Sequence, residues 1–149
     1  PANLGLGLYE SAANQCSDDE ERYFNFEYRS TDAPWRKKIM NFLKEYKING
    51  VIFLTGDRHH SEIIKVERPG TYPLYDITVS PLTSGTHVFV ISEKNNPYRV
   101  LGIDQKQNYG KFSFSGRGTD RKLTVEFFGT KGEKLGSWSV SEKELKTPQ

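Results

Sequence analysis

Hydrophobic spacing near the start of the chain predicts one amphipathic helix. Apolar and aromatic side chains recur there every three or four residues, which is the period of one helix face. Thr31 or Asp32 is expected to cap its start, Pro34 suits its first turn, and Asn49–Gly50 is expected to end it. The stripe consists of Trp35, Ile39, Phe42, Leu43 and Tyr46.

The helix leads directly into a short apolar run, Val51–Leu54, which predicts a strand. The run has no polar alternation, which is typical of a strand covered on both faces. We therefore expect this strand near the centre of a sheet. Gly56 follows it and allows a sharp backbone turn.

From the Val51 strand onward the pattern indicates β structure. The glycine-rich segment 129–132 predicts a hairpin loop, and Gly136 a bulge in the returning strand. The fold class expected is α+β, with a mainly antiparallel sheet and one principal amphipathic helix packed on it. The further strands expected are 63–66, 74–79, 87–91, 112–115, 123–128 and 134–140.

The ends of the chain carry weaker patterns. Residues 1–33 are expected to form an irregular arm, with a short strand at 23–28. Ser17 and Glu20 have capping-box spacing, and the acidic run 18–21 is expected to be a solvated face rather than a metal site. Residues 34–145 are expected to form one domain, and the tail 146–149 to fray.

Composition narrows the function classes. The chain has 149 residues, 35% of them hydrophobic and 13% aromatic, so its core must rely on large rings. A net charge of +2 argues against a nucleic-acid binder that neutralises phosphates. No apolar run approaches membrane-spanning length, and Cys16 is single, so no internal disulfide forms. The chain begins at Pro1 without Met, as expected of a mature product or a piece of a longer protein.

The residues after the Val51 strand carry the candidate chemistry. Asp57 and His59 supply a hard oxygen and an imidazole nitrogen, which suit half of a metal site. Arg58 and His60 are candidate substrate contacts, Arg58 because arginine binds phosphate bidentately. The alternative interpretation is a polar turn whose histidines are only hydrogen-bonded. His87 is expected to be such a hydrogen-bonded histidine rather than a ligand.

The segment 50–62, with Gly56, Asp57 and His59 in it, resembles the Gly-Asp-x-His motif of PhoD-like alkaline phosphatases. These belong to the calcineurin-like metallophosphoesterase superfamily. Segment 75–85 is similar to the family's strand and Ser/Thr-rich loop, and Asn108-Tyr109-Gly110 before a hairpin is similar to its C-terminal end. The resemblance covers most of the chain, from about residue 34 to 140.

The resemblance implies a phosphomonoester or phosphodiester hydrolase with two metal ions, calcium and iron, with zinc or manganese as alternatives. It implies that Asp57 and His59 are metal ligands. The family's other ligands come earlier in its chain, so this chain looks like a C-terminal portion, half of the family's αββα sandwich, and inactive alone. The resemblance also implies a periplasmic or secreted parent.

With half of the sandwich missing, a second copy of the chain is expected to be able to cover an exposed sheet face, giving a homo-oligomer. Two other functions stay open. One is a non-catalytic, β-rich accessory or binding domain that retains the motif without chemistry. The other is a non-enzymatic single-metal site made by Asp57, His59 and His60.

Overall fold

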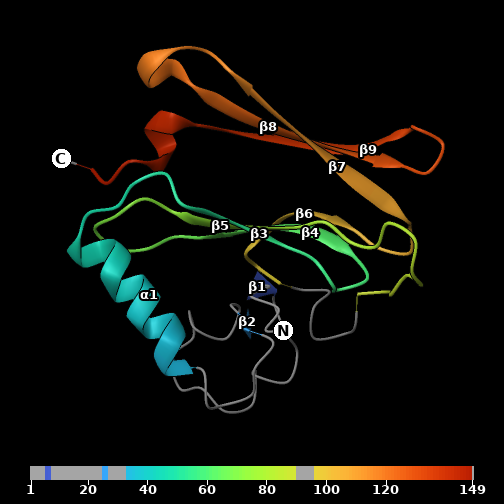
Figure 1. The fold of residues 1–149 in the computed structure, drawn as a ribbon, viewed down its shortest axis with the longest axis horizontal. Helices are drawn as coiled ribbons and strands as arrows, with labels where there is room; N and C mark the ends of the chain where they lie inside the picture. The colour runs from blue at the N-terminus through green and yellow to red at the C-terminus, as the bar shows by residue number, and fades with distance from the viewer. Residues whose placement is uncertain (1–5, 8–24, 27–32, 90–95, 149) are drawn as a thin grey trace.

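Two stacked β-sheets and one helix form three layers (Figure 1). The computed structural model describes residues 6–7, 25–26, 33–89 and 96–148. A three-stranded sheet lies on one side, a four-stranded sheet lies in the middle, and the helix covers the far face of the four-stranded sheet (Figure 1). The expected α+β class with mostly antiparallel pairing and one principal helix is confirmed.

The elements follow the chain in one order. They are β1 (Leu6–Gly7), β2 (Asn25–Phe26), α1 (Ala33–Glu45), β3 (Ile52–Thr55), β4 (Ser61–Val66), β5 (Leu74–Thr78), β6 (Arg99–Ile103), β7 (Asn108–Ser115), the 3₁₀ turn η3 (Gly118–Asp120), β8 (Lys122–Gly129), β9 (Lys134–Ser141) and the 3₁₀ turn η4 (Glu142–Leu145).

Helix α1 confirms the helical prediction but ends earlier than expected. Lys47 adopts the left-handed conformation at φ 48°, the N–H of Ile48 donates to Leu43 O at 2.9 Å, and that of Lys47 donates to Lys44 O at 3.2 Å. This pair of bonds is a Schellman motif, so Lys47 and not Asn49–Gly50 stops the helix. Thr31 and Asp32, the expected caps, lie outside the described residues.

Only part of the predicted helix stripe is buried. Leu43 is buried, and Met40 packs against the apolar side of the four-stranded sheet. Phe42 and Tyr46 instead face outward, and their rings lie 4.5 Å apart. The helix therefore covers its sheet with a narrower face than the sequence pattern suggested.

The four-stranded sheet has the order β3-β5-β4-β6, with β3 parallel to β5 and the other pairs antiparallel. The central placement expected for the Val51–Leu54 strand is wrong, because β3 is an edge strand of this sheet and β5 takes the inner position. Leu54 is 62% exposed on that edge. The arm strand β1 comes close to both β3 and β5.

The second sheet is an antiparallel meander, β7-β8-β9. Its hairpin after β8 and the bulge near Gly136 are confirmed, since the pairing passes from Phe127↔Gly136 to Phe128↔Lys134 and leaves one extra residue on β9. This sheet faces solvent on its outer side, where Tyr109 stacks on Phe128 at 5.5 Å.

One strand prediction, 87–91, was wrong over its described residues, and one strand was missed. Residues 87–89 form no strand, because the backbone of His87 bonds to the loops on either side and the Phe89 N–H donates to Asp104 Oδ2 at 3.0 Å. Strand β6 was missed because Gly102 interrupts its pattern. A side chain at Gly102 would collide with Arg99 and Phe89, which pack over it.

The main core lies between the two sheets, and a smaller apolar cluster lies under α1. The smaller cluster centres on Ile64, Val66 and Leu74. The main core contains Ile63, Tyr72, Tyr75, Ile77, Ile103, Leu123, Val125, Phe127, Val140 and Leu145.

The tail is hydrogen-bonded as far as Thr147, whose N–H donates to Asn49 Oδ1 at 2.8 Å.

Candidate functional site

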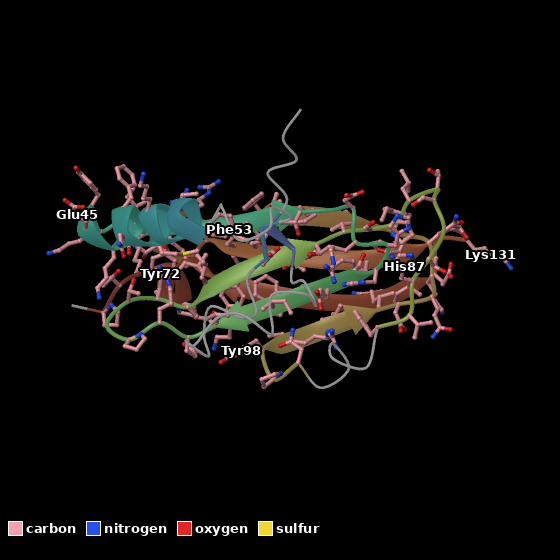
Figure 2. All side chains as sticks on the ribbon, turned by 90° about the horizontal axis from the view of Figure 1, so that it is seen from below. Glu45, Phe53, Tyr72, His87, Tyr98 and Lys131 are labelled. Carbon is pink, nitrogen blue, oxygen red and sulfur yellow. The ribbon has the colours of Figure 1, made fainter. Side chains whose placement is uncertain are left out.

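The candidate residues lie where two parallel strands end. Because β3 and β5 are parallel and paired as Thr55↔Thr78, their carboxyl ends reach the same edge of the sheet. The loops that follow them, residues 56–60 and 79–89, therefore meet there. His87 lies at the opposite end of the molecule from Glu45 of α1 (Figure 2).

The first of these loops has an unusual backbone. Asp57 and His59 both have positive φ, at 67° and 60°. Left-handed conformations are uncommon for residues other than glycine, and they persist only where surrounding contacts hold them. Here the His59 N–H donates to Ser80 Oγ at 3.1 Å, and His59 O accepts the N–H of His87 at 2.9 Å.

The imidazole of His59 is fixed by the second loop. Its Nδ1 lies within hydrogen-bond reach of Gly85 O, and a carbonyl oxygen only accepts, so Nδ1 carries the proton. In the neutral ring this leaves the lone pair on Nε2, the arrangement in which histidine ligates metals. The ring of His87 stacks on that of His59, with centroids 4.6 Å apart and planes at 18°.

Asp57 is exposed, two residues before His59 on the same turn. Sequence reasoning placed both residues at this rim, and the structure agrees. It did not bring His87 into the same cluster, since 27 residues separate His59 from His87 in the numbering and only folding stacks them. The backbone N–H of His87 donates to His59 O, whereas the hydrogen-bonding expected of the His87 side chain stays a prediction.

His60 points the other way and is 2% exposed. Its Nε2 lies 3.3 Å from Glu62 Oε1, and its ring meets Phe89 edge-on at 4.7 Å. This is a packing position, so the structure offers no surface through which His60 contacts a substrate. Arg58 is partly buried, and its charge acts on the buried Asp76.

Glu62 is a buried carboxylate in the middle of a polar network. Arg99 Nε donates to Glu62 Oε2 at 2.9 Å, while the Arg99 guanidinium lies 3.8 Å above the Phe89 ring. Burial by itself raises the pKa of Glu62, but its interactions with His60 and Arg99 outweigh that effect, and the net pKa lies below the usual range. Glu62 therefore stays ionised.

Asp76, on the inner strand β5, has the opposite balance. It is 1% exposed, and its Oδ1 accepts the hydroxyl of Thr55 at 2.9 Å, whereas its Oδ2 has no hydrogen-bond partner among the described residues. Burial raises the pKa of Asp76 well above its usual range, and the nearby Glu62 charge adds to this, against the Thr55 hydrogen bond and the Arg58 charge.

The set of candidate metal ligands in the described residues is incomplete. Among the described residues, no three histidine, cysteine or acidic side chains converge on one point where a metal ion could bind. Asp57 and His59 thus fit one side of a metal centre by chemistry and by exposure, but not a whole one. Within the same part of the chain, no helix is long and apolar enough to cross a membrane.

Comparison with known proteins adds no relative. No family model, no curated protein and no solved structure matches the chain.

Proposed function

We propose that this chain is the C-terminal part of a metal-dependent phosphoric ester hydrolase, in which Asp57 and His59 are ligands of the metal centre. The observation that carries the proposal is the hydrogen bond from His59 Nδ1 to Gly85 O. It leaves Nε2 unprotonated, with a lone pair that can bind a metal ion, on a turn that begins with an exposed carboxylate. The strained backbone at both positions supports a functional role, because such strain clusters at functional sites.

The chain's own residues prepare the ligands. The left-handed turn places Asp57 and His59 at the rim, and the stack with His87 restrains rotation of the His59 ring. A carboxylate oxygen with a neutral imidazole suits iron, zinc or manganese, and the carboxylate also suits calcium. Two such ions, when bound, would polarise the phosphoryl group and supply a nucleophilic water.

The remaining ligands come from outside the described residues. The observed order of layers, helix, sheet and sheet, corresponds to three layers of an αββα sandwich, which supports the assignment to a part of a larger enzyme. Arg58 stays the proposed phosphate contact, whereas His60 is left out because its ring is buried. A periplasmic or secreted parent and a second copy on an exposed sheet face stay predictions.

The test uses manganese as a paramagnetic probe. Mn²⁺ titrated into the labelled chain should broaden the amide and imidazole NMR signals of Asp57, His59 and Gly85 first. Asp57→Asn and His59→Ala should each raise the Mn²⁺ concentration needed by about tenfold, since each removes one ligand. Asp120→Asn is the matched control, because Asp120 is a 74% exposed carboxylate in η3.

Equal broadening at Asp57 and Asp120, or unchanged binding by both ligand variants, would overturn the metal assignment. That outcome would favour the alternative of a non-catalytic, β-rich binding domain. Retention of His59 broadening in the Asp57→Asn variant alone would instead reduce the proposal to a single imidazole ligand.

A further inference from the structure

A buried asparagine from the second sheet holds the two site loops together. Asn108 is the first residue of β7 and is 1% exposed. Its Oδ1 accepts the hydroxyl of Ser61 at 2.6 Å, and its Nδ2 donates to Ser80 O at 3.3 Å and to Lys106 O at 3.0 Å. Its backbone N–H donates to Pro81 O at 2.8 Å. Every polar atom of the side chain is therefore used.

Ser61 and Ser80 extend this arrangement to His59. The Ser61 hydroxyl oxygen accepts the Ser80 N–H at 2.9 Å. The shortest hydrogen bond that this hydroxyl donates goes to Asn108 Oδ1. Ser80 Oγ in turn accepts the His59 N–H at 3.1 Å. Ser61 and Ser80 are both buried, so these hydrogen bonds form where the alternative partner, bulk water, is excluded.

Gln107, the residue just before β7, holds the far side of the loop. Gln107 Nε2 donates to Thr83 O and Ser84 O, both at 3.0 Å. These carbonyls immediately precede Gly85, whose own carbonyl accepts the His59 ring proton. The start of β7 is thus connected to the backbone of His59 through Ser80 and to the imidazole of His59 through Gly85.

We infer that Asn108 is a positioning residue for His59: it fixes the 80–85 loop so that Gly85 O holds the imidazole as its Nδ1–H tautomer. As a statement about metal affinity this rests on the proposed function; as a statement about the tautomer it does not. Loss of the Asn108 side chain should release the Ser80 end of the loop while the Gln107 hydrogen bonds remain, and the shifted loop should no longer hold the His59 ring in one tautomer. Asn108 is not a ligand itself. Changing a group that orients a metal-binding histidine typically weakens metal binding 10–100-fold.

The experiment reads the tautomer without any metal. At pH 8.5, where imidazoles are neutral, ¹⁵N NMR of wild-type His59 should show a protonated Nδ1 and an unprotonated Nε2. In Asn108→Ala the protonated Nδ1 signal of His59 should be lost in favour of an averaged tautomer. Asn49→Ala is the matched control, since the Asn49 side chain also joins two distant segments, but it does so by accepting the Thr147 N–H on the tail, away from the site.

A second variant separates positioning from folding. Asn108→Asp keeps Oδ1 for Ser61 but loses both amide donors, so it should release Ser80 O while preserving the shape of the site. Far-ultraviolet circular dichroism establishes that each variant is folded. Mn²⁺ affinity at His59, measured by the same broadening, should fall about tenfold in each folded Asn108 variant and stay unchanged in Asn49→Ala.

A folded Asn108→Asp or Asn108→Ala chain with the wild-type His59 tautomer overturns the inference. If neither variant folds, Ser61→Ala gives the decision, because it removes the hydroxyl that joins Asn108 to the Ser80 N–H. An unchanged tautomer in folded Ser61→Ala then overturns it, and a lost one supports it. If wild type shows the Nδ1–H tautomer but binds no Mn²⁺, the proposed function fails while the positioning role stands.

Discussion

Replacing Asp76 with asparagine should change the stability of the fold in a pH-dependent way. Asp76 lies on β5, paired with Phe53 of β3 on one side and Ile64 of β4 on the other. Asparagine keeps an oxygen at the position that accepts the Thr55 hydroxyl. It removes the negative charge that burial opposes, and it places an amide group where Oδ2 has no partner in the described part of the chain.

The direction of the pH dependence follows from the pKa of Asp76, which burial raises. Between the ordinary aspartate pKa of about 3.9 and the raised folded value, the native state holds a proton that the unfolded state has lost. The contribution of Asp76 to the free energy of unfolding is therefore most favourable below about pH 4 and becomes less favourable as pH rises through that window. Glu62, whose pKa is lowered, works in the opposite sense, and its contribution is lost as pH falls.

The size of the change in the free energy of unfolding follows from Asp76 Oδ2, which is buried without a hydrogen-bond partner among the described residues. A buried polar group without a partner destabilises by about 1–3 kcal/mol, and more when it is charged. At pH 8, Asp76→Asn exchanges a disfavoured carboxylate for an unpaired amide, so it should raise the free energy of unfolding by about 1–2 kcal/mol. At pH 4 both side chains are neutral and of similar shape, and the two proteins should agree within about 0.5 kcal/mol.

Urea denaturation followed by tryptophan fluorescence at pH 4, 6 and 8 measures this difference. Comparing the variant with wild type at each pH isolates the contribution of Asp76 together with its coupling to Glu62, because the other titrating groups are common to both proteins. Asp120→Asn, at an exposed aspartate, should show no such trend. A difference that is equal at pH 4 and pH 8, or an Asp76→Asn protein that is less stable at pH 8, would refute the assignment of a buried, proton-holding Asp76.

Three further predictions concern the core, the helix end and activity. Phe127→Ala, at a 0% exposed ring between the sheets, should lower the free energy of unfolding measured in urea by about 3–5 kcal/mol. Phe114→Ala, at a 79% exposed ring, should change the same free energy by less than about 0.5 kcal/mol. Similar losses in the two variants would contradict the core assignment. Lys47→Gly should raise the free energy of unfolding, measured by thermal denaturation, by about 0.5–1 kcal/mol, because glycine adopts φ 48° without the penalty of a side chain. A lower free energy of unfolding would show that the Lys47 side chain stabilises the fold by more than its backbone strain costs. The isolated chain should hydrolyse p-nitrophenyl phosphate only at the buffer rate with calcium, iron, zinc or manganese, because its described residues bring too few ligands together. Efficient turnover would contradict its assignment as a part of an enzyme.

The candidate site was predicted in part from local sequence. A strand that ends at Gly56 followed by Asp57 and His59 is a local pattern, and the structure places these residues at the predicted rim. The partners that hold them are far along the chain: Gly85 binds the His59 ring and Asn108 fixes the loop. No periodicity relates such positions, so only the folded chain shows which of them meet.

His60 shows the same limit from the other side. It is adjacent to His59, and in sequence the two residues look equally available. The turn sends one to the rim and the other into the packing of Phe89 and Glu62. That difference depends on the positive φ of His59 and on the pairing of β4, neither of which a single sequence specifies.

The amino-acid sequence by itself determined the type of most elements, because a side-chain period of 3.6 or 2 is a local property. It predicted α1, the hairpin from β8 to β9 with its bulge, and the mainly antiparallel α+β class. Only the tertiary structure decided that β3 lies at the edge of its sheet while β5 lies inside, since strand order depends on which distant segments exchange hydrogen bonds. Tertiary packing likewise decided that Asp76 is buried from solvent, because such burial arises only when separate layers of the fold pack against each other.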